Sequence, residues 1–145
     1  MKGKGVGGAR GVPAATIGTL VLSQHEAVRR QLVAYLGRSP ALAASGEPFA
    51  PEAIARARPD VLVLDLSRLG PADLETAIEA ARLVGARLIA LASMPEPADE
   101  ARVRRAGGTY RLKAAGADGL AEVVLAAARG PAADGPAGGR PVGGG

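Results

Sequence analysis

The sequence predicts one α/β domain built on a five-stranded, doubly wound parallel sheet. Short apolar runs of strand length alternate five times with segments whose apolar residues recur at helical spacing. The strongest strand runs are continuous, which is typical of strands that are buried on both faces. The foldable stretch, residues 16–129, is long enough to cover such a sheet with helices and to bury a core.

Each predicted strand is followed by a predicted helix. The strands are expected at 17–22, 42–45, 61–66, 87–92 and 109–112. The helices are expected at 26–37, 53–58 with Pro51 at the start, 71–81, 96–106 and 120–127. Pro51 and Pro71 suit the first turn of a helix, and Gly107-Gly108 ends the fourth helix. Because βα units cross over with one hand, this order favours helices on both faces of the sheet.

Both ends of the chain are predicted to be disordered tails. Residues 1–15 hold five glycines, and glycine and proline fill ten of the sixteen positions from 130 to 145. Such segments have few apolar side chains to offset the entropy of ordering a backbone. We therefore expect a Gly-rich tail at 1–15, a folded domain at 16–129 and a Gly/Pro-rich tail at 130–145.

Composition excludes several classes of protein. There is no cysteine and a single histidine, His25, which argues against disulfides, thiolate metal sites and multi-histidine metal sites. No apolar run reaches the roughly 18 residues of a membrane helix, so we expect a cytoplasmic protein with no membrane partner. The net charge of +4 raises the question of nucleic acid, but the arginines are scattered, and one Phe, two Tyr and no Trp offer few rings to stack on bases. Nucleic-acid binding is therefore not expected.

Two charged residues stand at strand ends, where ligands of parallel sheets bind. Asp65 is the only acidic side chain inside an apolar strand, and Lys113 is the only lysine in the folded region, where the other cations are arginines. A compact ammonium suits one carboxylate better than a planar guanidinium does. We expect Asp65 and Lys113 to lie within salt-bridge reach. The simpler interpretations, a capping carboxylate and a chance surface lysine, stay open.

Three motifs resemble those of bacterial response-regulator receiver domains over residues 17–129. Arg58-Pro-Asp-Val-Leu-Val-Leu-Asp65-Leu, followed by Gly70, resembles the phosphoacceptor strand and loop. Leu22-Ser-Gln-His-Glu-Ala-Val-Arg-Arg30 resembles the first loop and helix, and Tyr110-Arg-Leu-Lys113 resembles the switch aromatic and the lysine. The resemblance implies a flavodoxin-like receiver fold, with Asp65 as phosphoacceptor, Lys113 as phosphate-site lysine and Tyr110 as switch aromatic.

The sequence departs from the family at the metal and hydroxyl positions. Ser23 and Gln24 stand where the family has an acidic pair that holds Mg²⁺, which prefers carboxylate oxygens. Ala92 stands at the switch hydroxyl position, with Ser93 beside it as a shifted substitute. Ser23-x-x-Glu26 also matches a capping box, so we expect Ser23 to cap the first helix. We therefore expect Mg²⁺ binding to be weak or absent, and no other cofactor.

These features predict an atypical (pseudo-)receiver without an output domain, which acts as a signalling and protein-interaction module and not as an enzyme. Phosphorylation at Asp65 is expected to be weak or absent. A sensor kinase or downstream regulator would bind the face of helix 96–106, strand 109–112 and helix 120–127, through Arg102, Arg104, Arg105 and Tyr110. Two alternatives stay open: a phosphorylatable stand-alone response regulator of a phosphorelay, and a small-molecule-binding flavodoxin-like module. The sequence predicts no oligomeric state.

Overall fold

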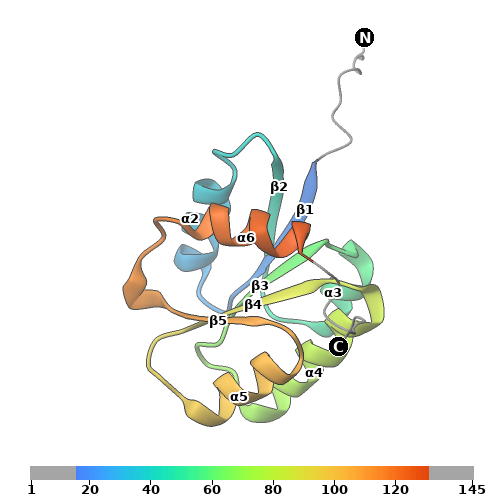
Figure 1. The fold of residues 1–145 in the computed structure, drawn as a ribbon, viewed down its shortest axis with the longest axis vertical. Coiled ribbons are helices and arrows are strands. Elements are labelled where there is room, and N and C mark those ends of the chain that lie inside the picture. The colour runs from blue at the N-terminus through green and yellow to red at the C-terminus, as the bar shows by residue number, and fades with distance from the viewer. Residues whose placement is uncertain (1–15, 131–145) are drawn as a thin grey trace, which may run out of the picture.

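A computed structural model describes residues 16–130, which form a five-stranded sheet in the order β2-β1-β3-β4-β5 (Figure 1). All four strand pairings are parallel. The strands are β1 (Ile17–Leu22), β2 (Leu42–Glu47), β3 (Val61–Asp65), β4 (Arg87–Ala92) and β5 (Thr109–Leu112). The predicted fold class, a single domain on a five-stranded parallel doubly wound sheet, is confirmed.

Five α-helices connect and cover the strands. They are α2 (Glu26–Leu36), α3 (Pro51–Ala57), α4 (Pro71–Val84), α5 (Pro97–Arg105) and α6 (Leu120–Arg129). A short 3₁₀ turn, η1 (Lys113–Ala115), follows β5 and was not predicted. Pro51 and Pro71 occupy the first positions of their helices, as expected from a ring that fixes φ and lacks an N–H. None of the described helices is long and apolar enough to cross a membrane.

Alternate residues of each central strand belong to two separate cores. In β3, Val61 and Val63 pack in the core beneath α2 and α6, whereas Leu62 and Leu64 pack in the core beneath α3, α4 and α5. Because both faces are covered, all five residues of β3 are buried. The continuous apolar run that predicted this strand is the direct consequence.

The strand order reverses beside β1, and this reversal positions the site. β2, which follows β1 in the chain, lies on one side of β1, and β3 lies on its other side. Leu22 and Leu64 are partners in the β1–β3 register, so the residues that follow them emerge side by side at the carboxyl edge. A crevice of this kind is where open α/β sheets bind their ligands.

The described region extends one residue into the predicted C-terminal tail. The predicted tails at 1–15 and 131–145 lie outside the described residues. Gly130 lies inside them, and its carbonyl accepts a 2.6 Å hydrogen bond from Nη2 of Arg87 at the start of β4. This contact ties the end of α6 to the sheet at the edge opposite the crevice.

Candidate functional site

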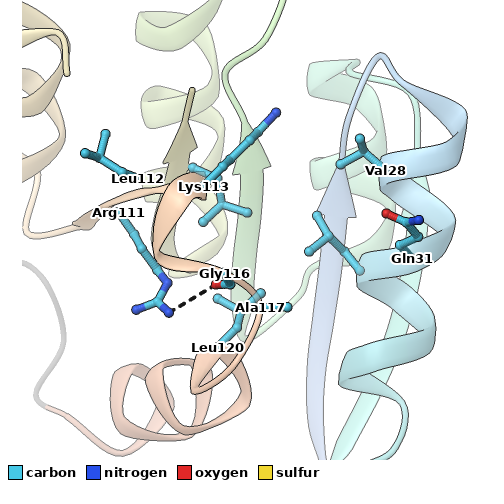
Figure 2. Close-up of a pocket in the computed structure, with 10 residues that line it drawn as sticks. Val28, Gln31, Arg111, Leu112, Lys113, Gly116, Ala117 and Leu120 are labelled. Atoms are coloured by element: carbon cyan, nitrogen blue, oxygen red, sulfur yellow. Dashed lines mark hydrogen bonds between the residues drawn. The ribbon is translucent and has the colours of Figure 1, made fainter. Parts of the chain in front are cut away.

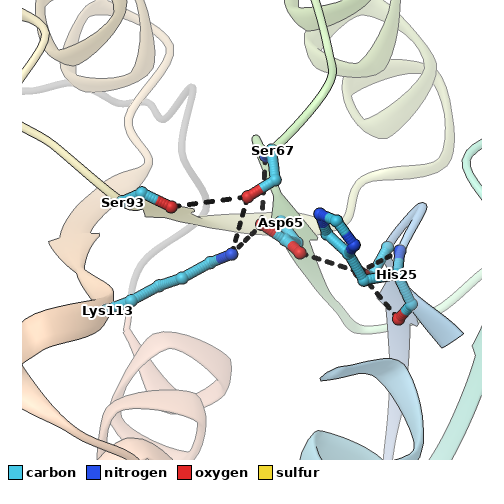
Figure 3. Close-up of polar contacts among 6 residues, drawn as sticks. His25, Asp65, Ser67, Ser93 and Lys113 are labelled. Carbon is cyan, nitrogen blue, oxygen red and sulfur yellow. Dashed lines mark hydrogen bonds and ion pairs between the residues drawn. The ribbon is translucent and has the colours of Figure 1, made fainter. Parts of the chain in front are cut away.

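Asp65 ends β3 at the carboxyl edge of the sheet, and its side chain is 0% exposed. Nζ of Lys113 lies 2.6 Å from Oδ1 of Asp65 (Figure 3). Lys113 begins the turn after β5, so its side chain passes the end of β4, where the residue is the small Ala92. The predicted proximity of Asp65 and Lys113 is confirmed.

Two further donors complete the surroundings of the carboxylate. The backbone N–H of Ser67 donates to Oδ1 at 3.0 Å, and the hydroxyl of Ser23 donates to Oδ2 at 2.7 Å. Burial alone raises the pKa of Asp65, but the hydrogen bonds from Lys113, Ser23 and Ser67 and the charge of Lys113 outweigh it, so the pKa is lowered. Asp65 is therefore held as a buried, paired carboxylate.

The expectation that Ser23 caps the first helix is wrong. Helix α2 begins at Glu26 with His25 as its N-cap residue, and no side chain caps it. Ser23 is fully buried, and its hydroxyl bonds to Asp65 while its oxygen accepts the backbone N–H of His25 at 3.1 Å. A buried carboxylate without a hydrogen-bond donor costs more free energy than an uncapped helix start, whose N–H groups water can reach. The Ser23 hydroxyl therefore pairs with Asp65.

Gln24, which was expected at the second position of the family's acidic pair, contacts a neighbouring loop. Its Oε1 accepts the backbone N–H of Phe49 at 3.0 Å and so holds the segment between β2 and α3. Phe49 packs against the core beneath α3 and α4. Gln24 thus has a structural partner, and its exposed side chain adds no charge near Asp65.

The residues at the carboxyl edge do not fit Mg²⁺. Among the residues that contact one another at this site, Asp65 supplies the carboxylate, and both of its oxygens already accept hydrogen bonds. Within residues 16–130 no three His, Cys, Asp or Glu side chains are grouped so that they could hold a metal ion. Mg²⁺ gives up its water reluctantly and is usually held by one or two carboxylates together with phosphate oxygens. Ser23 and Gln24 are neutral and supply no charge that could hold the ion.

Ser67 belongs to the site, and the sequence analysis missed it. Its hydroxyl oxygen accepts a 2.7 Å hydrogen bond from Nζ of Lys113, so the ammonium has two partners, Asp65 and Ser67 (Figure 3). Ser93 is exposed and lies 3.5 Å from Ser67, hydroxyl to hydroxyl. Ala92 is buried and contributes no hydroxyl. In the sequence, the one indication of this role is that Ser67, a small polar residue, follows Asp65 at the strand end by two positions.

Tyr110 lies on β5, three residues before Lys113, but its side chain contacts the loop after β4 and not Asp65. Its hydroxyl donates to the carbonyl of Met94 at 3.3 Å and accepts the backbone N–H of Glu96 at 3.1 Å. Its ring packs, half-buried, against the core beneath α4 and α5. Tyr110 therefore holds the segment between β4 and the start of α5.

The arginines of α5 differ in their partners. Arg102 bonds to Glu75 of α4 at 2.9 Å and to Asp99 at 3.3 Å, and Arg104 bonds to Glu100 at 2.8 Å. Arg105 is exposed and has no ion pair within residues 16–130. Val103 is the only fully buried residue of α5, so the Arg102–Glu75 pair adds an attachment that apolar spacing did not predict.

Solved structures that are similar to this chain include response regulators. The receiver domain of NarL from Mycobacterium tuberculosis is 25% identical, with 79% of this chain and 98% of that chain covered and a TM-score of 0.68. The BeF3-activated receiver domain of Klebsiella pneumoniae RstA is 21% identical, with 78% and 99% covered and a TM-score of 0.66. A Burkholderia pseudomallei response regulator with a phosphorylated aspartic acid is 22% identical, with 78% and 66% covered and a TM-score of 0.61.

No protein-family model matches the sequence, and no curated protein sequence does. The classification therefore rests on the fold, on the strand order and on these neighbours in structure. The chain has the receiver-type fold, and its likeness to the NarL receiver domain supports a place in the response-regulator receiver family.

Proposed function

We propose that the chain is a receiver-type signalling module that binds a protein partner, and that phosphorylation of Asp65 is weak or absent. The observation that carries the proposal is the state of the Asp65 carboxylate. It is fully buried, and both of its oxygens accept hydrogen bonds, from Lys113 and Ser67 on one side and from Ser23 on the other. The pair of Asp65 and Lys113 is already neutral without a metal.

Phosphoryl transfer to a carboxylate requires a free oxygen for attack and cations that neutralise the oxygens of the phosphoryl group. In this chain an attacking Oδ2 would first have to release Ser23, and Oδ1 would have to release Lys113. Within residues 16–130, Lys113 is the cation that contacts Asp65 and would meet the incoming group. Because these hydrogen bonds must break first, phosphorylation of Asp65 should be slower than phosphorylation at a site with three carboxylates and a metal ion.

Labelling with acetyl phosphate tests this part of the proposal. The wild-type chain is expected to label slowly, with no dependence on Mg²⁺, because Ser23 and Gln24 supply no charge to hold the ion. The variant Ser23→Asp/Gln24→Asp is expected to label faster with Mg²⁺ than without it. Adding Asp65→Asn to that variant is the control and should abolish the signal.

If the wild-type chain labels as fast as the double variant and needs Mg²⁺ to do so, the proposal fails. The phosphorylatable response regulator would then be the better account. Labelling that persists in Asp65→Asn would place the chemistry at another residue.

The proposed partner surface is the face of α5, β5 and α6. Arg105 is exposed without an ion pair in the described region, and Arg104 is exposed beside Glu100, so this face can offer positive charge to an acidic partner such as a sensor kinase or a downstream regulator. Tyr110 supports the choice, since its hydroxyl bonds to the loop that leads into α5. Lys113 follows Tyr110 by three residues, so β5 and the turn after it connect this face to the site.

Charge reversal at Arg104 and Arg105 tests the face. Arg104→Glu/Arg105→Glu is expected to reduce capture of the partner that wild type binds, and the loss should be larger at low salt. The matched control is Arg30→Glu. Arg30 forms an exposed ion pair with Glu26 on α2, as Arg104 does with Glu100 on α5. If the reversed variant captures every wild-type partner and Arg30→Glu releases one, the partner binds through α2 instead.

A further inference from the structure

We propose that a second site, a pocket between α2 and the loop after β5, binds a small uncharged ring compound that carries one hydrogen-bonding substituent. The pocket has a volume of about 230 Å³. Ten residues line it: Val28, Gln31, Leu32, Leu91, Arg111, Leu112, Lys113, Gly116, Ala117 and Leu120. This inference goes beyond the proposed function and does not depend on it.

The pocket reaches the core and has a defined wall. Leu91 and Leu120, which are 5% and 1% exposed, form its floor. Val28 and Gln31 of α2 line one side, and Gly116 and Ala117 of the loop line the other (Figure 2). Nη2 of Arg111 donates to the carbonyls of Gly116 at 3.2 Å and Asp118 at 2.9 Å, which holds the loop in place. The pocket is therefore preformed, as ligand sites usually are.

Size and charge define the ligand. A dry cavity of roughly 150 Å³ accepts benzene, so this volume suits one ring with a short substituent. No acidic side chain lines the pocket. Of its two cations, Lys113 is paired with the Asp65 carboxylate, and Arg111 donates through Nη2 to two neutral loop carbonyls. A charged ligand would be desolvated against leucine and valine side chains, which is costly.

Gln31 provides the polar contact. Its amide is exposed and has no hydrogen bond within the described residues, and it lies on the α2 side of the pocket opposite Gly116 and Ala117 (Figure 2). An amide both donates and accepts, so it matches a carboxamide or phenol on a ring. Lys113 connects this pocket to the first site: its carbon chain lines the pocket, and its ammonium extends to Asp65. A ligand here would press on the residue that neutralises Asp65.

Titration of the ¹⁵N-labelled full chain with benzamide, followed by NMR, tests the proposal. Saturable shifts are expected for the backbone amides of Val28, Leu32, Lys113 and Ala117. Benzoate, which has nearly the same shape and one negative charge, should bind at least tenfold more weakly. The proposal is overturned if benzamide causes no saturable shift at these residues, or if benzoate binds equally well.

Two substitutions locate the binding. Val28→Phe fills the pocket and should weaken benzamide binding at least tenfold, whereas the control Ala27→Phe, on the exposed side of the same helix, should change it less than twofold. Gln31→Leu alters only an exposed side chain and remains informative if Val28→Phe fails to fold. It should weaken benzamide binding severalfold and leave toluene binding unchanged. Equal benzamide affinity in wild type and in folded Val28→Phe, or in Gln31→Leu, refutes the assignment.

Discussion

The hydroxyl of Ser23 donates a 2.7 Å hydrogen bond to Oδ2 of Asp65 at the point where the strand order reverses. Both residues are fully buried, although 42 positions separate them in the chain. Lys113 contacts the other carboxylate oxygen, so Asp65 has a donor on each side. The buried carboxylate thus has a neutral hydroxyl on one side and an ammonium on the other.

Lys113→Met should be the most destabilising single change at this site. It leaves a fully buried carboxylate without its cation, and breaking a buried pair costs about 3–5 kcal/mol. Because the Lys113 side chain is 27% exposed, the loss in free energy of unfolding should lie near the lower end of that range. Urea denaturation measures it. Asp65→Asn/Lys113→Met should recover part of the loss; no recovery would mean that Lys113 stabilises the fold by packing alone.

The pH dependence of stability should follow the lowered pKa of Asp65. A carboxyl group whose pKa is depressed in the folded state stabilises the fold above its unfolded pKa, and this contribution is lost as the pH falls through the folded value. The stability difference between wild type and Asp65→Asn should therefore be constant near neutral pH and shrink below the ordinary value of 3.8. Denaturation at a series of pH values checks this. A difference that already declines at pH 6 would mean that burial dominates and that the pKa is raised.

Ser67→Ala should cost more than Ser93→Ala. The hydroxyl of Ser67 accepts a 2.7 Å bond from Lys113, whereas Ser93 is exposed and 3.5 Å from Ser67. Losing a hydrogen bond to a charged group costs about 1.5–3 kcal/mol, and a surface change usually costs less than about 0.5 kcal/mol. Chemical denaturation of the two variants gives the comparison. Equal losses would show that Ser67 does not hold Lys113.

Most of the fold could be predicted because its signals are local. The run at 61–65 is apolar on both faces, and Pro51 and Pro71 mark the starts of α3 and α4. Strand ends also placed Asp65 and Lys113 at one edge of the sheet, since parallel strands end together. Each of these inferences needed only neighbouring residues and a rule for how parallel strands connect.

What the sequence did not predict depends on contacts between distant segments. Ser23 matches a local capping pattern with Glu26, but the buried charge of Asp65 competes for the same hydroxyl and wins. Ser67 has no motif of its own, and its role arises only because Lys113 extends across the end of β4. A sequence motif indicates a partner nearby in the chain, whereas Ser23 and Ser67 bond to residues more than 40 positions away.

Truncation to residues 16–130 should leave the fold intact, because the segments removed are rich in glycine and proline and offer little apolar surface. Thermal unfolding of the truncated and full chains checks this, and the midpoints should agree within about 2 °C. Gly130 is retained because its carbonyl bonds to Arg87. A large fall in the midpoint would show that a removed segment packs on the domain.

The central claim is that the Asp65 site is complete without metal, and Mg²⁺-dependent unfolding tests it most directly. An ion that binds only the folded state raises the unfolding midpoint with its concentration. Ser23→Asp/Gln24→Asp replaces the donor to Asp65 by like charge, so this variant should melt lower than wild type in chelator and recover as Mg²⁺ is added. The wild-type midpoint should not change up to about 10 mM Mg²⁺. A saturable rise of the wild-type midpoint at low millimolar Mg²⁺, abolished by Asp65→Asn, would contradict the account.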